Sequence, residues 1–409
     1  MSRFWLLFIL VVGSAVLNAQ TILPSFFSSG MVLQQQTKAA VWGWDKPNIK
    51  VTVKGSWGKT NSIQSDARGK WKLFIETPAA GGPFELKVVG TSTVILSNVL
   101  IGEVWLCAGQ SNMEMPVRGY NNQPVAGSNE AILQSSNSRI RFFNTTRATS
   151  IKPVQQVQGS WKEASPATTS LFSATAYFFA KKIHESIGVP VGIIQSAWGA
   201  STIESWMDST TISAFPGVAI PDSLPATNPN RTPTIMYNAM LHPYIGYAIK
   251  GVLWYQGEAN RENAQQYHLL FTALIQSWRE QWQLGDFPFY FAQIAPFEPG
   301  KVNAGYLREA QLQTMLSVKN TGMAVTMDVG EKNVIHPADK ATVGHRLAYW
   351  ALAKDYGIQG IAFSGPVYKQ MRVNANGRAI LSFAFAEMGL SNNGKPLQHF
   401  EIAGEDKQF

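Results

Sequence analysis

The chain has 409 residues, of which 45% are hydrophobic and 15% are charged, a composition that excludes long disorder and favours two or three packed domains. Its formal net charge of +8 is dispersed, with no run of Lys and Arg interleaved with aromatic residues, so nucleic acid is not an expected partner. Cys107 is the single cysteine, which excludes an intrachain disulfide and any metal cluster built on several cysteines.

Residues 1–19 have the pattern of a secretory signal peptide. Arg3 precedes an apolar run from Phe4 to Val12, and small residues follow. A retained membrane anchor is the alternative, but Gly13 interrupts the run well before the ~20 apolar residues that a membrane span needs. We therefore expect an exported protein, periplasmic or extracellular, with no membrane span after cleavage of the signal.

Residues 20–97 predict a small β-sandwich. Short segments of alternating polarity (AAVWGW, IKVTVKG, KWKLFIETP, FELKVVG) are separated by Gly, Pro, Asp and Ser turns. Such a domain is expected to be a structural flank packed on the catalytic domain, and carbohydrate binding is the alternative.

Residues 98–357 change to strands that alternate with amphipathic helices, which predicts a parallel sheet. The first long helix ends at Gly188, the segment GMAVTMD (322–328) predicts a strand, and 339–355 a helix. The expected fold class is therefore α/β, a three-layer doubly wound parallel sheet. Residues 358–409 return to β character and are expected to form a C-terminal β segment that is incomplete.

The turn after the strand EVWLCAG is the first candidate for chemistry. In open parallel sheets, ligands bind beyond the carboxyl ends of the strands. Here Gly109 permits a tight turn that exposes the hydroxyl and the backbone N–H of Ser111. Ser111 is thus a candidate nucleophile with its own N–H as an oxyanion donor; the alternative is an ordinary helix cap.

Three further strand ends add polar groups. After VGIIQS, Trp198 and Gly199 begin a small-residue turn in which the Gly199 amide can face an oxyanion. After KGVLWY, Gln256 offers a side-chain amide for the same purpose, with Glu258 close by. Of the six histidines, only His336 sits on a turn after a predicted strand of the parallel sheet, which makes it the plausible general base.

These segments also carry a family resemblance. The stretches GEVWLCAGQSNMEMPV, IQSAWGASTIESW, YNAMLHPYIGYAIKGVLWYQGEAN, LREAQ and IHPADKATVGHRLA resemble the sialate O-acetylesterase family, which belongs to the SGNH hydrolases. The resemblance implies Ser111 as the nucleophile, Gly199 and Gln256 as oxyanion donors, and His336 as the base. It also implies an O-acetylated carbohydrate substrate, such as sialic acid or acetylated xylan, and no metal or organic cofactor.

The acid of the expected triad is the point of departure from the family. The family often has an Asp just before the histidine, whereas here Asn333 and Val334 occupy those positions. The base is then oriented by a backbone carbonyl in a Ser–His dyad, or by Asp328 or Glu331; among the side chains, Glu331 is preferred.

Substrate contacts are assigned to Trp198, which can stack on a sugar, and to Glu258, for which a structural hydrogen bond is an equal alternative. A missing acid also leaves open a second function, a glycan-binding pseudoenzyme of the same fold without efficient turnover.

Overall fold

The computed structural model of the chain describes residues 20–297, 302–387, 389–392, 394–396, 398, 400–406 and 408, so the predicted signal peptide lies outside the described residues. The strands are β1 (Val32–Gln34), β2 (Lys38–Trp44), β3 (Lys50–Gly55), β4 (Thr60–Gln64), β5 (Lys70–Glu76), β6 (Gly81–Val89), β7 (Thr93–Gly109), β8 (Asn137–Asn144), β9 (Trp161–Ala164), β10 (Val191–Ala197), β11 (Gly251–Tyr255), β12 (Phe289–Ala292), β13 (Thr321–Ala324), β14 (Val367–Val373) and β15 (Ala379–Ala384). The α-helices are α1 (Ser111–Glu114), α2 (Ser128–Leu133), α3 (Pro166–Thr169), α4 (Ala174–Ile187), α5 (Ser209–Ile212), α6 (Ala264–Trp282), α7 (Gly305–Ser317) and α8 (Lys340–Lys354).

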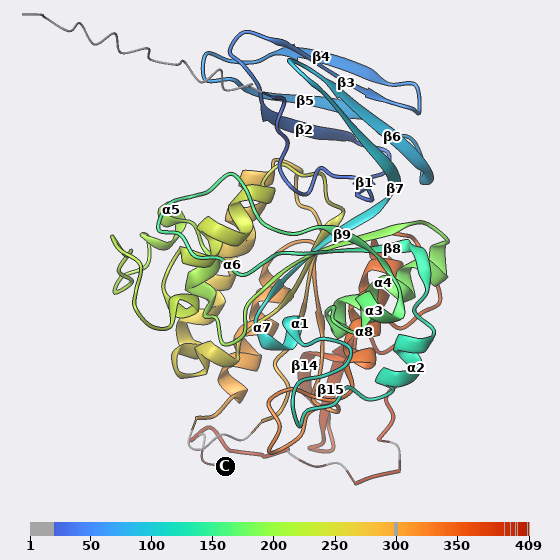
Figure 1. Cartoon of the computed structure of the whole chain (residues 1–409). Coiled ribbons are helices and arrows are strands. Elements are labelled where there is room, and N and C mark those ends of the chain that lie inside the picture. Colours follow the sequence, from blue (N-terminus) through green and yellow to red (C-terminus); the bar gives the residue numbers. More distant parts are fainter. Residues whose placement is uncertain are drawn as a thin grey trace, which may run out of the picture.

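The central sheet has the strand order β13-β12-β11-β7-β10-β8-β9. Its neighbours are parallel except for β9, which runs antiparallel to β8 (Figure 1). The predicted α/β class is therefore confirmed, as a mixed sheet with helices. The finer assignment to a three-layer SGNH-type arrangement stays a prediction.

Both faces of this sheet are buried, because successive side chains of a strand point to opposite sides. In β7, Trp105 and Cys107 belong to one hydrophobic cluster, whereas Val104 and Leu106 belong to the other. Helices α4 and α8 pack together over the first cluster, and α6 and α7 pack together over the second (Figure 1). The near-continuous apolar run of β7 reflects this burial on both faces.

Strand β7 connects the central sheet to the N-terminal strands. Its first half pairs with β6 and its second half with β10 and β11. The strand continues through residues 97 and 98, where the domain boundary is predicted, but its pairing with β6 shifts register there. A separate antiparallel pair, β2 and β5, lies beside β3, β4 and β6 (Figure 1). The alternating burial of β5 fits the polarity read from the sequence. The sandwich and the domain limits stay predictions.

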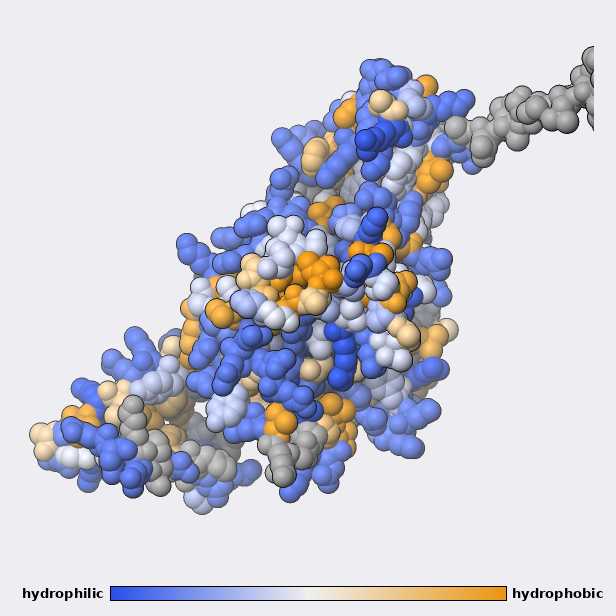
Figure 2. Space-filling view, turned by 90° about the vertical axis from the view of Figure 1, so that its left-hand side faces the viewer, coloured by the Kyte–Doolittle hydropathy of each residue, from blue (hydrophilic) through white to orange (hydrophobic). Residues whose placement is uncertain are grey.

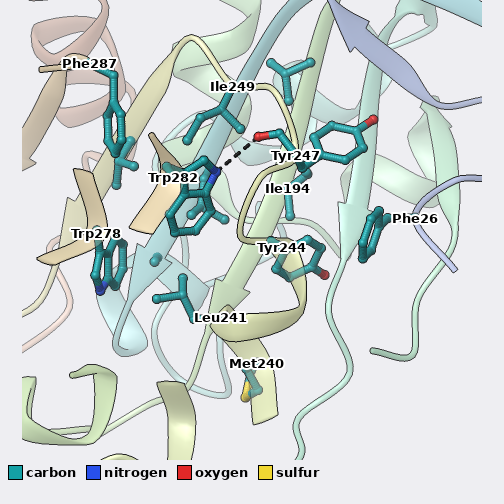
Figure 3. Packing of buried hydrophobic residues seen from close by; sticks show 14 of the residues in the cluster. Phe26, Ile194, Met240, Leu241, Tyr244, Tyr247, Ile249, Trp278, Trp282 and Phe287 are labelled. Atoms are coloured by element: carbon teal, nitrogen blue, oxygen red, sulfur yellow. Dashed lines mark hydrogen bonds between the residues drawn. The ribbon is translucent and has the colours of Figure 1, made fainter. Parts of the chain in front are cut away.

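Aromatic packing fixes the N-terminal segment to the α/β part. The Phe26 ring lies 5.1 Å from Tyr244 and 5.5 Å from Tyr247, centroid to centroid. Trp282 Nε1 donates a hydrogen bond of 3.1 Å to the Tyr247 carbonyl oxygen (Figure 3).

The narrow end formed by the N-terminal strands continues into a broader body, and the side of the molecule seen in Figure 2 is mainly hydrophilic.

Two C-terminal features complete the fold. Strand β13 stops at Ala324, four residues before the predicted end of that strand, because the chain turns there and Thr326 Oγ1 donates to the Gln293 carbonyl. Strands β14 and β15 form an antiparallel hairpin within the predicted C-terminal β segment.

Over the described ranges, none of the helices has the length and apolarity needed to cross a bilayer.

Candidate active site

The predicted site residues gather at the carboxyl ends of β7, β10 and β11. A pocket of about 420 Å³ opens there. It is lined by Gln110, Ser111, Glu114, Tyr120, Arg147, Gly199, Ala200, Arg231, Glu258, Ala259, Arg261, Ile335 and His336. Ser111, Gly199, Glu258 and His336 are thus brought together, whereas Gln256, Trp198 and Glu331 are not among the lining residues.

The nucleophile turn depends on Gly109. Its φ of +139° lies in a region that side chains disfavour, and a Cβ atom there would be 2.2 Å from the Tyr255 carbonyl oxygen. The next residue, Gln110, donates its backbone N–H to that same oxygen at 3.0 Å. The strand therefore ends abruptly and Ser111 becomes the first residue of α1, with its hydroxyl on the pocket side.

Ser111 and His336 are in direct contact. His336 Nε2 lies 2.7 Å from Ser111 Oγ, and His336 Nδ1 lies 2.5 Å from Gln123 Oε1. Because an amide oxygen only accepts hydrogen bonds, Nδ1 carries the proton and Nε2 is left as the acceptor for the serine hydroxyl. Ser111, His336 and Gln123 are thus linked in a chain of hydrogen bonds.

The orienting group corrects the sequence prediction. Gln123, and not Glu331, holds the imidazole; Glu331 is exposed and its backbone bridges to Val334. Asp328, the other predicted acid, forms a bidentate pair with Arg346 at 2.6 Å for each oxygen. The physical reason is that the loop after α1 folds back over the His336 turn, across 213 positions of sequence, and no local signal in the chain marks that contact.

The environment of His336 favours the neutral imidazole. Burial, and then the positive charge of Lys340, lowers the pKa of His336 from its ordinary value to about 4. The side chain is thus an unprotonated acceptor across the neutral and weakly acidic range, as a general base needs to be.

A buried polar network behind Ser111 joins the segments that carry Ser111 and His336. Asn112 Nδ2 donates to Glu258 Oε1 at 2.6 Å and to the Ile335 carbonyl at 3.0 Å, and Asn112 Oδ1 accepts from Lys340 Nζ. Burial raises the pKa of Glu258, and burial lowers the pKa of Lys340 to about 7 against the opposing effect of Glu258. Sequence reasoning missed Asn112 and Lys340, although both sit inside the motifs that carry Ser111 and His336.

Glu258 is one of the residues that line the pocket. Its Oε2 is buried and has no hydrogen bond within the part of the chain that the structure describes. The structural hydrogen bond expected as the alternative role is present at Oε1.

Two of the three predicted oxyanion donors, Gly199 and Gln256, have other partners. The Gly199 N–H donates to Glu114 Oε2 at 2.8 Å, because Glu114 follows Ser111 by one turn of α1 and reaches the same side. Gln256 Nε2 donates to the Ser201 carbonyl at 3.0 Å and to Asn260 Oδ1 at 2.7 Å. Gln256 is fully buried behind the pocket, so its amide does not face the nucleophile.

Trp198 also has a different setting from the one predicted. Its ring packs under Arg147, whose guanidinium carbon lies 5.3 Å from the ring centroid, and Arg147 pairs with Glu114. Stacking of Trp198 on a sugar stays a prediction. Within the described residues, no three His, Cys, Asp or Glu side chains gather as metal ligands would.

Comparisons with known proteins identify the family of the chain. Residues 101–353 match the family described as carbohydrate esterase, sialic acid-specific acetylesterase. The sialate O-acetylesterase of Pongo abelii is 32% identical, over 93% of this chain and 79% of that protein, and the one of Homo sapiens is 31% identical over the same shares. A crystal structure of a carbohydrate acetylesterase from Xanthomonas citri is similar with a TM-score of 0.85 and 36% identity, covering 95% of this chain and 88% of that one.

Proposed function

Because the chain belongs to the carbohydrate esterase family of sialic acid-specific acetylesterases, and is thus a carboxylic ester hydrolase, we propose that it removes O-acetyl groups from carbohydrate as a serine esterase. The observation that carries the serine mechanism is the contact of His336 Nε2 with Ser111 Oγ at 2.7 Å, within the range of a nucleophile–base pair.

The proposed reaction proceeds in two steps. His336 Nε2 takes the hydroxyl proton while Ser111 Oγ attacks the acetyl carbonyl carbon, and the carbonyl oxygen becomes an oxyanion. The carbonyl re-forms, the sugar oxygen leaves with the proton from His336, and an acetyl-Ser111 ester remains. Water, deprotonated by His336, then attacks this ester, and acetate and the free serine are released.

Gln123 has a positioning role in this scheme. Its Oε1 accepts the Nδ1 proton and keeps the imidazole in the tautomer that presents Nε2 to Ser111. An amide has no negative charge, so it orients the ring without stabilising the imidazolium as a carboxylate would. The mechanism is thus a Ser–His pair supported by a neutral third residue.

The substrate contacts belong to the same proposal. Glu258 lines the pocket and is assigned to substrate binding, with its Oε2 buried and without a partner among the described residues, so a sugar hydroxyl could reach this oxygen only after a local shift. O-acetylated sialic acid and acetylated polysaccharide are both candidates, since one set of relatives is named for sialate and another for carbohydrate in general. Export by the segment 1–19 remains part of the proposal.

A glycan-binding pseudoenzyme is the less favoured function. The nucleophile, the base and an orienting side chain are all in contact, an arrangement that glycan binding alone does not require.

The test is acetate release from O-acetylated sialic acid and from acetylated xylan by the wild type, Ser111→Ala and the control Ser213→Ala. Ser213 is an exposed serine that is not among the residues lining the pocket. Its hydroxyl donates to the Thr210 carbonyl oxygen of its own helix. Release that persists in Ser213→Ala and disappears in Ser111→Ala supports the proposal. Equal release by both variants removes Ser111 as nucleophile, and no release from either substrate by the wild type favours the binding protein.

A further inference from the structure

We propose that the side-chain amide of Gln110, together with the backbone N–H of Ser111, forms the oxyanion hole of this enzyme. The inference rests on the proposed serine mechanism and names the donors that would stabilise its tetrahedral intermediate. It keeps the Ser111 N–H, which the sequence predicts as a donor, and puts Gln110 in place of the other two predicted donors, Gly199 and Gln256.

The Gln110 side chain is held in one orientation. It is 2% exposed and lines the pocket directly before the nucleophile. Its Oε1 accepts two backbone N–H groups of the β11 loop, from Gly257 at 3.2 Å and from Ala259 at 3.3 Å. Because both hydrogen bonds anchor the oxygen, the amide cannot turn over without losing them, and its Nε2 is directed away from that loop.

The nitrogen of this amide is available to a ligand. No hydrogen bond from Gln110 Nε2 is found among the described residues, and it is not one of the fully buried polar atoms without a partner. It therefore reaches the space of the pocket. Ser111 N likewise has no acceptor in the described part of the chain, since it is the first residue of α1.

The other two predicted donors, Gly199 and Gln256, already have hydrogen-bond partners. Glu114 accepts the Gly199 N–H, and Arg147 holds Glu114 in place through contacts of 2.7 Å and 2.5 Å to Oε1. Moving this carboxylate would break hydrogen bonds on both of its oxygens. The Gln256 amide is fully buried against Ser201 and Asn260. Gln110 Nε2 is consequently the side-chain donor beside Ser111 that needs no rearrangement.

The chemistry of the step supports a donor fixed in advance. The oxyanion forms one bond from the attacked carbon, beside Ser111 Oγ, and a preorganised N–H needs no reorganisation when the charge develops. Loss of one such donor typically lowers kcat by a factor of about 10² to 10³, with a small effect on substrate binding.

The decisive variant is Gln110→Glu, which separates the two ends of the amide. A carboxylate keeps an acceptor for the Gly257 and Ala259 N–H groups, but it has no donor for the oxyanion and places negative charge near it. We expect kcat for p-nitrophenyl acetate to fall by about 10² to 10³, KM to change by less than about threefold and the melting temperature to stay close to that of the wild type. Gln134→Glu, at an exposed position at the end of α2, is the charge-matched control and should behave as the wild type.

A neutral variant and a binding assay remove the remaining ambiguity. Gln110→Met lacks the donor without adding charge, and turnover is counted per site titrated by an irreversible phosphonate, so that misfolded protein does not enter the rate. Affinity for an alkylboronic acid, whose tetrahedral adduct with Ser111 mimics the intermediate, should fall in parallel with kcat in both variants.

The outcomes distinguish this inference from the proposed function. If Ser111→Ala abolishes turnover while Gln110→Glu and Gln110→Met retain kcat and boronate affinity within about threefold, Gln110 is not an oxyanion donor and the serine mechanism stands. If Ser111→Ala retains turnover, the serine mechanism itself fails. A parallel loss of kcat and boronate affinity in both Gln110 variants supports the assignment.

Discussion

Replacement of Gln123 by glutamate tests how the catalytic histidine is controlled. Gln123 Oε1 lies 2.5 Å from His336 Nδ1, so a carboxylate at this position would face the imidazolium at nearly the same distance. In the wild type, burial and the charge of Lys340 lower the pKa of His336 to about 4. The group at Nδ1 is the neutral Gln123 amide, which adds no negative charge to oppose this shift. The variant adds the missing charge in the smallest possible change of shape.

The size of the effect follows from the attraction between two unit charges. At a separation of about 4 Å it is about 1 kcal/mol in water and about 4 kcal/mol at an effective dielectric constant of about 20. One pKa unit corresponds to about 1.4 kcal/mol, and His336 is partly exposed, so we expect its pKa to rise by about one to two units. Activity requires the neutral imidazole and is lost as the pH falls through this pKa. The acidic limb of kcat/KM should thus move from near pH 4 to between about pH 5 and pH 6.

The assay is the pH profile of kcat/KM for p-nitrophenyl acetate, read beside two controls. Asn121→Asp puts the same charge on the same loop at an exposed side chain and should leave the acidic limb unmoved. Gln123→Ala removes the acceptor without adding charge and should lower kcat without raising the pKa. An acidic limb in Gln123→Glu that coincides with that of the wild type would refute the claim that Gln123 orients His336.

Three further variants follow from the same geometry. Glu331→Gln should leave kcat within about twofold, because Glu331 is exposed; a loss of about 10² or more, measured in parallel with Gln123→Ala, would restore it as the orienting acid. Gly109→Ala should lower the free energy of unfolding by at least about 3 kcal/mol in denaturant titration, since its φ is +139° and a Cβ meets the Tyr255 carbonyl at 2.2 Å; unchanged stability would show that the turn relaxes. Lys340→Met should raise the pKa of His336, because a nearby positive charge is removed, and should lower the melting temperature by breaking the contact with Asn112; an acidic limb that moves down in pH would contradict the first effect.

Local patterns were sufficient to locate the strand ends that carry chemistry. The glycine at position 109, the apolar strand before it and the helix after it are all properties of neighbouring residues, and they led to Ser111. His336 was selected because it precedes a proline and a helix on the turn after a predicted strand. The structure brings these two side chains into contact across 225 positions.

The same reasoning failed where a polar group had more than one possible partner. Gly199 and Gln256 do stand after strands, as predicted, but Glu114 and Ser201 accept their hydrogen bonds. Nothing in the spacing of these residues indicates which acceptor comes closest. The orienting residue was missed for the same reason, since Gln123 lies on an irregular loop without a motif.

The continuous course of β7 shows a similar limit at the level of the fold. A change from β to α/β patterning near residue 98 sets the predicted domain limit, and one strand, β7, continues through that position because its two halves pair with different neighbours. The hydrophobic periodicity of a segment indicates which of its side chains are buried, but it does not indicate with which strand the segment pairs.

The sequence by itself determined the α/β class, the turns on which Ser111 and His336, the proposed nucleophile and base, lie, and the family. Hydrophobic periodicity, glycine turns and motif order are properties of adjacent residues. Only the tertiary structure decided that Gln123 contacts His336 Nδ1, that Glu114 accepts the Gly199 N–H, and that the β11 loop holds Gln110 Oε1 while its Nε2 has no acceptor among the described residues. A hydrogen bond is made or lost within a few tenths of an ångström around ~3 Å, and such distances between residues far apart in the chain are set by the packing of the whole fold.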